Sequence, residues 1–305
     1  MVEETVQHHK RAPSALVFMA RAFRPSAGLA RDGCFPHLTQ RWAGMRFEPG
    51  HLAAFQRATG LTVEDGVSLL YPHVLGFRLQ MAVLTHLAFP LPIWTALQIR
   101  NRLVRHRPLD LDATFDLETR VGAHRLVAKG VEVDLVSRLS RGSECYWQSE
   151  ITYFYRGQYE GERSEATRAA SPDLSAMSIV DQFQMPQGGG WAFGRLTGDY
   201  NGIHTWSWYA RRLGFRAAFS HPQRVTGLCL ARLRGPQTDA QTLDLWIKGP
   251  VFYGAEVVLS AVNDDSSLWF GLALAGDPRT AIVGAWRGAV DQVQTNMDKA
   301  GPKYA

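Results

Sequence analysis

Residues 243–254 read Leu243-Asp-Leu-Trp-Ile-Lys-Gly-Pro-Val-Phe-Tyr-Gly254, a strand-like run that ends in a proline-bearing bend and a turn glycine. Further strand-like runs follow at residues 255–263, 268–275 and 280–287. A helix-like stretch at residues 203–213 precedes them and is closed by Gly214, a residue type that favours helix ends. One helix combined with several consecutive strands predicts an α+β unit with an antiparallel sheet.

The first half of the chain repeats this order of elements. A helix-like stretch at residues 72–87 is followed by strand-like runs at residues 96–108, 113–120, 126–137 and 146–156. The alternation Val131-Glu-Val-Asp-Leu-Val136 has the period of two that is typical of a half-buried strand. A long helix wrapped by an antiparallel sheet is the hotdog arrangement. The repeat therefore predicts a double hotdog, in which two antiparallel sheets each wrap a central helix.

The domain boundaries follow from a shift in composition. Residues 156–176 are polar, charged and poor in apolar side chains, which is typical of a linker. We therefore expect an N-terminal hotdog at residues 14–155 and a C-terminal hotdog at residues 177–290, joined by the linker at 156–176. The polar residues 1–13 are expected to be a frayed start.

The overall composition is that of a globular protein. Of the 305 residues, 46% are hydrophobic and 20% are charged, which excludes a disordered or collagen-like chain. No apolar run is long enough to span a bilayer or to form a convincing signal peptide, so we expect a cytoplasmic protein that does not enter a membrane. Three scattered cysteines favour neither disulfides nor a metal site, and we expect no metal and no cofactor.

Positive charge is concentrated in one stretch. The formal net charge of +5 is compatible with nucleic acid, an acidic membrane surface or an anionic small ligand. Between Tyr200 and Thr238 the chain has six arginines and no Asp or Glu. A stretch with only positive charges favours binding of a phosphate group. A solvated basic face is the alternative interpretation.

The candidate chemistry lies in residues 193–204, which read Phe193-Gly-Arg-Leu-Thr-Gly-Asp-Tyr-Asn-Gly-Ile-His204. Asp199 follows Gly198 in a predicted turn and His204 opens a predicted helix, so a carboxylate and an imidazole can converge on one water molecule. The carboxylate can deprotonate the water and the imidazole can exchange the proton near neutral pH, while Asn201 can orient the pair. Helix capping is the alternative role for Asp199 and Asn201.

This stretch resembles a known family motif. Thr197-Gly-Asp-Tyr-Asn-Gly-Ile-His204, with Ser220-His221 downstream, is similar to the hydratase motif of MaoC-like (R)-specific enoyl-CoA hydratases and dehydratases, Ser-Gly-Asp-x-Asn-Pro-Ile-His followed by Ala-His-Gly-Met. Trp246-Ile-Lys-Gly-Pro-Val-Phe-Tyr-Gly254 resembles the sheet segment of that family. Leu70-Tyr-Pro-His-Val-Leu-Gly-Phe77 resembles the N-terminal half of its double-hotdog members.

The resemblance implies a reaction and a set of roles. The reaction is the reversible hydration of trans-2-enoyl thioesters to (R)-3-hydroxyacyl thioesters, or the reverse dehydration, without a metal. The C-terminal hotdog would be catalytic through Asp199 and His204, and the N-terminal hotdog would be degenerate and make room for the acyl chain. The supporting residues would be Gly198, Asn201, Ser220, His221 and Gln223, and the thioester or CoA would be bound by Arg211, Arg212, Arg216, Arg224 and Arg232.

The implied partner is an acyl-CoA or an acyl carrier protein thioester rather than a nucleic acid, and a homodimer of double hotdogs is a further expectation. Two positions depart from the family pattern, Gly202 in place of Pro and Pro222 in place of Gly. The family glycine is thought to donate its backbone N–H to the thioester oxygen, which Pro222 cannot do. The backbone N–H of Gln223 or a donor from the other half would then replace it. A hotdog thioesterase and a non-catalytic acyl-thioester binding protein remain as alternatives.

Overall fold

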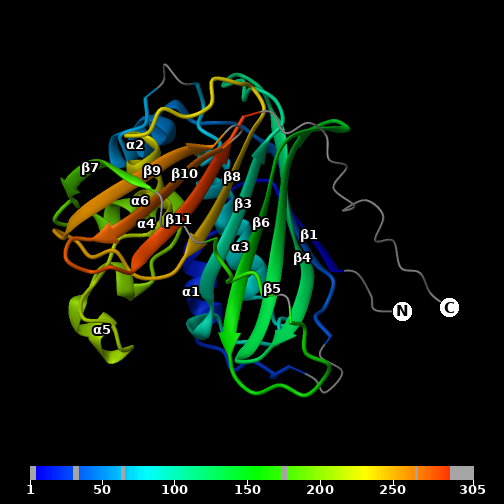
Figure 1. The fold of residues 1–305 in the computed structure, drawn as a ribbon. Helices are drawn as coiled ribbons and strands as arrows, with labels where there is room; N and C mark the ends of the chain where they lie inside the picture. Colours follow the sequence, from blue (N-terminus) through cyan, green and yellow to red (C-terminus); the bar gives the residue numbers. More distant parts are fainter. Residues whose placement is uncertain are drawn as a thin grey trace.

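The computed structural model describes residues 5–29, 34–62, 66–165, 167–172, 177–264 and 267–288. In these ranges eleven strands form one sheet, in the order β1-β2-β4-β5-β6-β3-β8-β11-β10-β9-β7 (Figure 1). The first half of the chain contributes β1 (Thr5–His9), β2 (Leu38–Met45), β3 (Leu97–Arg105), β4 (Phe115–Val127), β5 (Gly130–Arg141) and β6 (Glu144–Arg156). The second half contributes β7 (Ser178–Gln184), β8 (Gln241–Ile247), β9 (Glu256–Asp264), β10 (Ser267–Leu274) and β11 (Thr280–Arg287).

Most of the helices lie behind this sheet in the view of Figure 1. The first half holds α1 (Ala15–Ala22), α2 (Pro49–Thr59), α3 (Tyr71–Leu84) and the short 3-10 helix η1 (Ile93–Thr95). The second half holds α4 (Gly190–Thr197), the 3-10 helix η2 (Gly202–His204), α5 (Ser207–Arg212) and α6 (Pro222–Leu230).

The two halves meet at an antiparallel pair of strands. Strand β3 pairs with β8, and Leu103 lies opposite Leu243 at the centre of the junction. The two predicted sheets are therefore continuous, because the edge strand of each half completes the hydrogen bonding of the other. All neighbouring strands are antiparallel except β1, which runs parallel to β2. Residues 5–9 thus belong to the sheet, although the polar sequence was expected to be frayed.

Helix α3 is the central helix of the first half, as predicted. Every residue of α3 is buried except Arg78, so the helix has no polar face. It ends near Leu84, where the hydroxyl of Thr85 donates to the carbonyl of Met81. A helix without a polar face is stable only when it is enclosed on all sides, and here strands β2, β4 and β5 pack on one side of α3 and helices of both halves pack on the others.

The central helix of the second half differs from the prediction. The predicted stretch 203–213 forms only the short elements η2 and α5, and in α5 only Ala210 is buried. Figure 1 shows α5 projecting away from the sheet. The buried helix is α6, which begins with Pro222 at its first position, where a missing N–H is tolerated. The prediction rested on a helix-like stretch closed by Gly214, which does not distinguish a buried helix from an exposed one, and Trp206 and Trp208 of this stretch are exposed.

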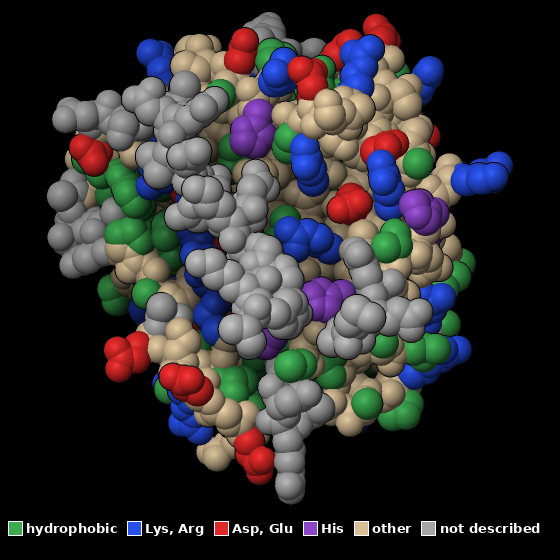
Figure 2. All heavy atoms as spheres, turned by 90° about the vertical axis from the view of Figure 1, so that its right-hand side faces the viewer, with side chains coloured by type: hydrophobic (Ala, Val, Ile, Leu, Met, Phe, Trp, Pro, Cys, Tyr) green, Lys and Arg blue, Asp and Glu red, His purple; other side chains and the backbone are tan. Residues whose placement is uncertain are grey.

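No helix of the described ranges combines the length and the apolar character needed to cross a membrane. On the face that Figure 2 shows, charged side chains of both signs are interspersed with smaller apolar areas.

The buried histidines make the stability of the fold sensitive to acid. Burial lowers the pKa of His73, on α3, to about 4, from about 6.5 in an unfolded chain. Below pH 6.5 the unfolded state therefore binds a proton that the folded state does not, so the free energy of unfolding falls as the pH drops toward 4. For His73 the loss is up to about 3 kcal/mol. Urea titrations at pH 7.5, 5.5 and 4.5 measure it, and a His73→Gln variant that shows the same pH slope would contradict this assignment.

Candidate active site

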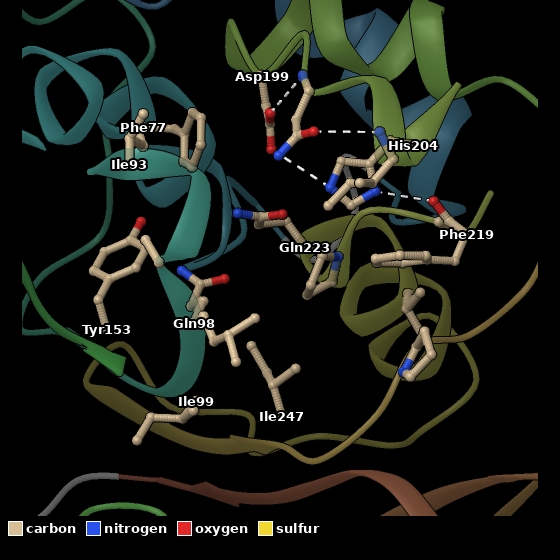
Figure 3. A pocket seen from close by; sticks show the side chains of 18 of the residues that line it. Phe77, Ile93, Gln98, Ile99, Tyr153, Asp199, His204, Phe219, Gln223 and Ile247 are labelled. Atoms are coloured by element: carbon tan, nitrogen blue, oxygen red, sulfur yellow. Dashed lines mark hydrogen bonds and ion pairs between the residues drawn. The ribbon is translucent and has the colours of Figure 1, made fainter. Parts of the chain in front are cut away.

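A cavity of about 400 Å³ lies between the two halves and is lined by both of them (Figure 3). Asp199, His204, Ser220, Pro222 and Gln223 of the second half form one part of its wall. The first half contributes mostly apolar side chains from α1, α3 and the region around η1 and β3, among them Met19, Phe77, Met81, Leu84, Ile93 and Trp94. The cavity therefore joins a polar, titratable wall to an apolar chamber.

A tight turn holds Asp199. Gly198 ends α4 with a φ of 87°, a left-handed conformation that favours glycine. The N–H of Asp199 donates to the hydroxyl of Thr197 at 2.9 Å, and Oδ1 of Asp199 accepts the N–H of Asn201 at 3.1 Å. The Asn201 side chain in turn accepts the N–H of Ile203 at 3.2 Å. Oδ2 of Asp199 is left to face the cavity.

The orientation of His204 fixes its tautomer. Its Nδ1 lies 2.9 Å from the carbonyl oxygen of Phe219, which can only accept, so Nδ1 carries the proton and Nε2 a lone pair. Nε2 faces Oδ2 of Asp199 at 3.7 Å. Burial lowers the pKa of His204 although the Asp199 charge opposes this, so the ring is neutral near pH 7. One water molecule can bridge two acceptors at this separation.

His221 supports both members of the pair. Its ring stacks on that of His204, with centroids 3.9 Å apart and planes inclined by 26°. Its Nε2 donates to the backbone carbonyl of Asp199 at 3.3 Å. Burial, followed by the neighbouring His204, lowers its pKa well below the usual range. His221 therefore acts as a neutral donor that ties the turn of Asp199 to the ring of His204.

Asp199, His204 and His221 also form a cluster of metal-ligand types, with one ligand atom of each within 4.8 Å of the others. A metal would need the lone pairs of both imidazoles to converge on one point. Two stacked rings direct their lone pairs side by side instead, and Nε2 of His221 already donates to the Asp199 carbonyl. The cluster fits a water molecule better than a metal ion.

None of the five predicted arginines is among the cavity-lining residues. The guanidinium of Arg224 donates to the carbonyls of Ala58 and Gly188, and that of Arg232 pairs with Asp181. These two side chains are engaged in internal contacts. Arg211, Arg212 and Arg216 are exposed, on and just after α5, close to the cavity-lining Phe215.

Residues of the first half hold the helix that leads to Asp199. Nε2 of His51 donates to the carbonyl of Leu196 at 3.0 Å, and the guanidinium of Arg78 donates to that of Arg195 at 3.3 Å. The Tyr71 hydroxyl donates to Nδ1 of His51 at 3.0 Å and fixes its tautomer. These carbonyls belong to the last turn of α4, where backbone carbonyls find no N–H partner within the helix. Sequence reasoning missed this contact because 117 residues separate Arg78 from Arg195.

Sequence reasoning also missed Tyr253, whose hydroxyl donates to the His204 carbonyl at 2.9 Å, although Tyr253 lies in the sheet segment quoted above. The carbonyl of Phe219, which sets the tautomer of His204, gives no signal in a sequence, because any residue type supplies a carbonyl.

No family model matches the chain, but individual proteins and solved structures are similar to it. The chain is 25% identical over 258 residues to the 3-hydroxyacyl-thioester dehydratase X of Mycobacterium tuberculosis, across 83% of this chain and 90% of that protein. The crystal structure of HtdX from the same organism is similar with a TM-score of 0.70 and 22% identity, across 82% of this chain and 100% of that one. A MaoC-like dehydratase from Phytophthora capsici gives a TM-score of 0.66 and 17% identity, across 84% of this chain and 96% of that one. The hotdog fold predicted from the repeat is thereby confirmed, and the chain is similar in sequence to a 3-hydroxyacyl-thioester dehydratase and in structure to MaoC-like dehydratases.

Proposed function

We propose that the protein is a hydro-lyase that adds water to trans-2-enoyl thioesters to give (R)-3-hydroxyacyl thioesters, or removes it in the reverse reaction. The observation that carries the proposal is the pair of Asp199 Oδ2 and His204 Nε2, 3.7 Å apart in the wall of a largely apolar cavity. The name of the curated relative, a 3-hydroxyacyl-thioester dehydratase, supports the same reaction. A cytoplasmic location and a homodimer remain part of the proposal.

In the hydration direction one water donates its two O–H groups to Asp199 Oδ2 and to His204 Nε2. The water oxygen bonds to C3 of the enoyl chain, and the electron pair of the double bond moves toward C2 and the thioester oxygen. Asp199 takes a proton from the water and passes it to the unprotonated Nε2 of His204. His204 then delivers this proton to C2. One water is added, and both side chains return to their starting protonation states.

The negative charge that develops on the thioester oxygen needs donors. Helix α6 has its N-terminus in the cavity wall, where Pro222 and Gln223 both line the cavity. Pro222 has no N–H, so the first helical donor is the N–H of Gln223, which has no partner within the helix. We propose that this N–H meets the thioester oxygen, while Ser220 lines the same wall and His221, just behind it, positions Asp199 and His204.

Crotonyl-CoA distinguishes this function from the two alternatives. Hydration removes the absorbance of the conjugated enoyl thioester without releasing thiol. A thioesterase would release free CoA thiol, and a binding protein would do neither. Thiol release at a rate that matches the loss of absorbance would refute the proposed reaction.

We propose that Arg211, Arg212 and Arg216 bind the phosphates of the CoA or carrier-protein handle. Replacing all three with Gln is expected to raise the Michaelis constant about tenfold, equivalent to about 1.4 kcal/mol of binding, with little change in turnover because they do not touch the reacting carbons. The effect should shrink with added salt. The control is Arg234→Gln, which removes an exposed charge of the same stretch. An unchanged Michaelis constant for the triple variant would show that these arginines do not bind the substrate and form only a solvated basic face.

A further inference from the structure

The position of Gln98 depends on an irregularity in β3. Along this strand Arg100 and Arg102 bond Asp244, whereas Leu103 packs in the core. In a regular strand the side chains of neighbouring residues alternate between the two faces of the sheet. The pairing of β3 with β6 shifts between Gln98 and Arg100, so both Gln98 and Ile99 line the cavity. A bulge of this kind re-aims one side chain, and such bulges are common beside active sites.

The amide that the bulge turns inward has no partner in the protein. Nε2 of Gln98 is buried and has no hydrogen-bond partner among the described residues, and the same holds for Oε1 of Gln223. Gln223 itself is only 3% exposed. Figure 3 shows Gln98 and Gln223 extending into the same cavity from opposite halves. A buried donor without a partner lowers stability by about 1–3 kcal/mol, a cost that a ligand acceptor in the cavity would offset.

We propose that Gln98 is a catalytic residue of the first half, whose Nε2–H group donates to the thioester oxygen beside the N–H of Gln223. It supplies the second donor that Pro222, which lacks an N–H, cannot provide. This inference rests on the proposed hydratase function. It assigns a direct part in the chemistry to the half that lacks the Asp–His pair.

The first test compares turnover in Gln98→Met with the control Gln182→Met, which replaces an exposed glutamine of β7. Methionine keeps the length of the side chain but cannot donate. Gln98→Met is expected to lower the turnover of crotonyl-CoA by up to about 100-fold, the contribution of one oxyanion donor. The Michaelis constant should change little, because the donor acts mainly on the charge that develops during reaction. An unchanged turnover would overturn the inference.

The second test is rescue. Pro222→Gly returns a backbone N–H to the start of α6, so it should restore much of the turnover lost in Gln98→Met. In the wild-type background the same change should have a smaller effect, because Gln98 already fills the role. If the turnover of the Gln98→Met/Pro222→Gly double variant changes by the product of the two single effects, the two positions are independent and the inference is overturned.

The third test separates a contact with substrate from a structural role. Asp199→Asn should bind crotonyl-CoA without converting it, and in that complex a hydrogen bond to the thioester oxygen should move the enoyl absorbance to longer wavelength. Adding Gln98→Met should reduce that shift, and an undiminished shift would exclude the contact. If wild-type protein hydrates no enoyl thioester at all, the proposed function fails instead, so the two failures are distinguishable.

Discussion

Replacing Asp199 with Asn is expected to lower the turnover of enoyl-thioester hydration by about 100- to 10,000-fold, the range of general acid–base contributions. The substitution keeps the size of the side chain and its capacity to accept the Asn201 N–H, which Oδ1 accepts in the structure. It removes the negative oxygen that faces His204. The fold and the melting temperature should therefore stay close to wild type while catalysis is lost.

His204→Gln removes the proton shuttle and should have an effect of similar size. Because we propose that both residues act on one water molecule, the double variant should be scarcely worse than either single one. Crotonyl-CoA turnover, measured with circular dichroism on the same samples, provides the test. Near-normal hydration by either single variant would show that the pair is not the catalytic centre.

A methyl group at Gly190 is expected to lower turnover by about 100-fold or more without touching the side chain of Asp199 or of His204. A Cβ at this position would lie 1.8 Å from the carbonyl oxygen of His204 and 2.7 Å from the Tyr253 hydroxyl. The backbones of Gly190 and His204 must together move apart by more than an ångström to relieve the clash. A displacement of that size is enough to lose about 100-fold in rate.

Gly188→Ala is the matched control, because a Cβ there meets nothing within 4 Å. It should retain normal turnover, whereas Gly190→Ala should lose it with the secondary structure intact. Tyr253→Phe distinguishes the clash with the His204 carbonyl from the loss of the Tyr253 hydrogen bond, since it deletes that hydrogen bond without adding bulk. Full activity in Gly190→Ala would show that the position of His204 is not critical.

Local patterns predicted much of the sheet. Strand β11 has the predicted bounds, 280–287, and β6 and β8–β10 lie within a few residues of their predicted ranges, because alternation and turn glycines are encoded within each strand. The predicted run 126–137 merged the end of β4 with β5, because the turn at 128–129 carries no glycine before Gly130. Strand β1 was missed because its side chains are polar, and its stability comes from backbone pairing with β2.

The candidate site was predictable where a motif is contiguous. Asp199, Asn201 and His204 lie within six residues, so their convergence follows from one turn and one helical start. The residues from the first half were not predictable. Gln98 faces the cavity through a bulge, and Arg78 and His51 reach α4 only after the chain has folded. Such contacts join residues that are distant in sequence, and no local pattern marks them.

The hydrogen bonds from His51 and Arg78 to α4 make the second half dependent on the first. A C-terminal half paired with a second copy of itself would lack His51 and Arg78, and the carbonyls of Leu196 and Arg195 would lose these donors. Deleting the first half would therefore leave the last turn of α4, which leads to Asp199, without these donors. If Asp199 is catalytic, substitutions at His51 and Arg78 would then be constrained by activity although neither residue belongs to the Asp–His pair.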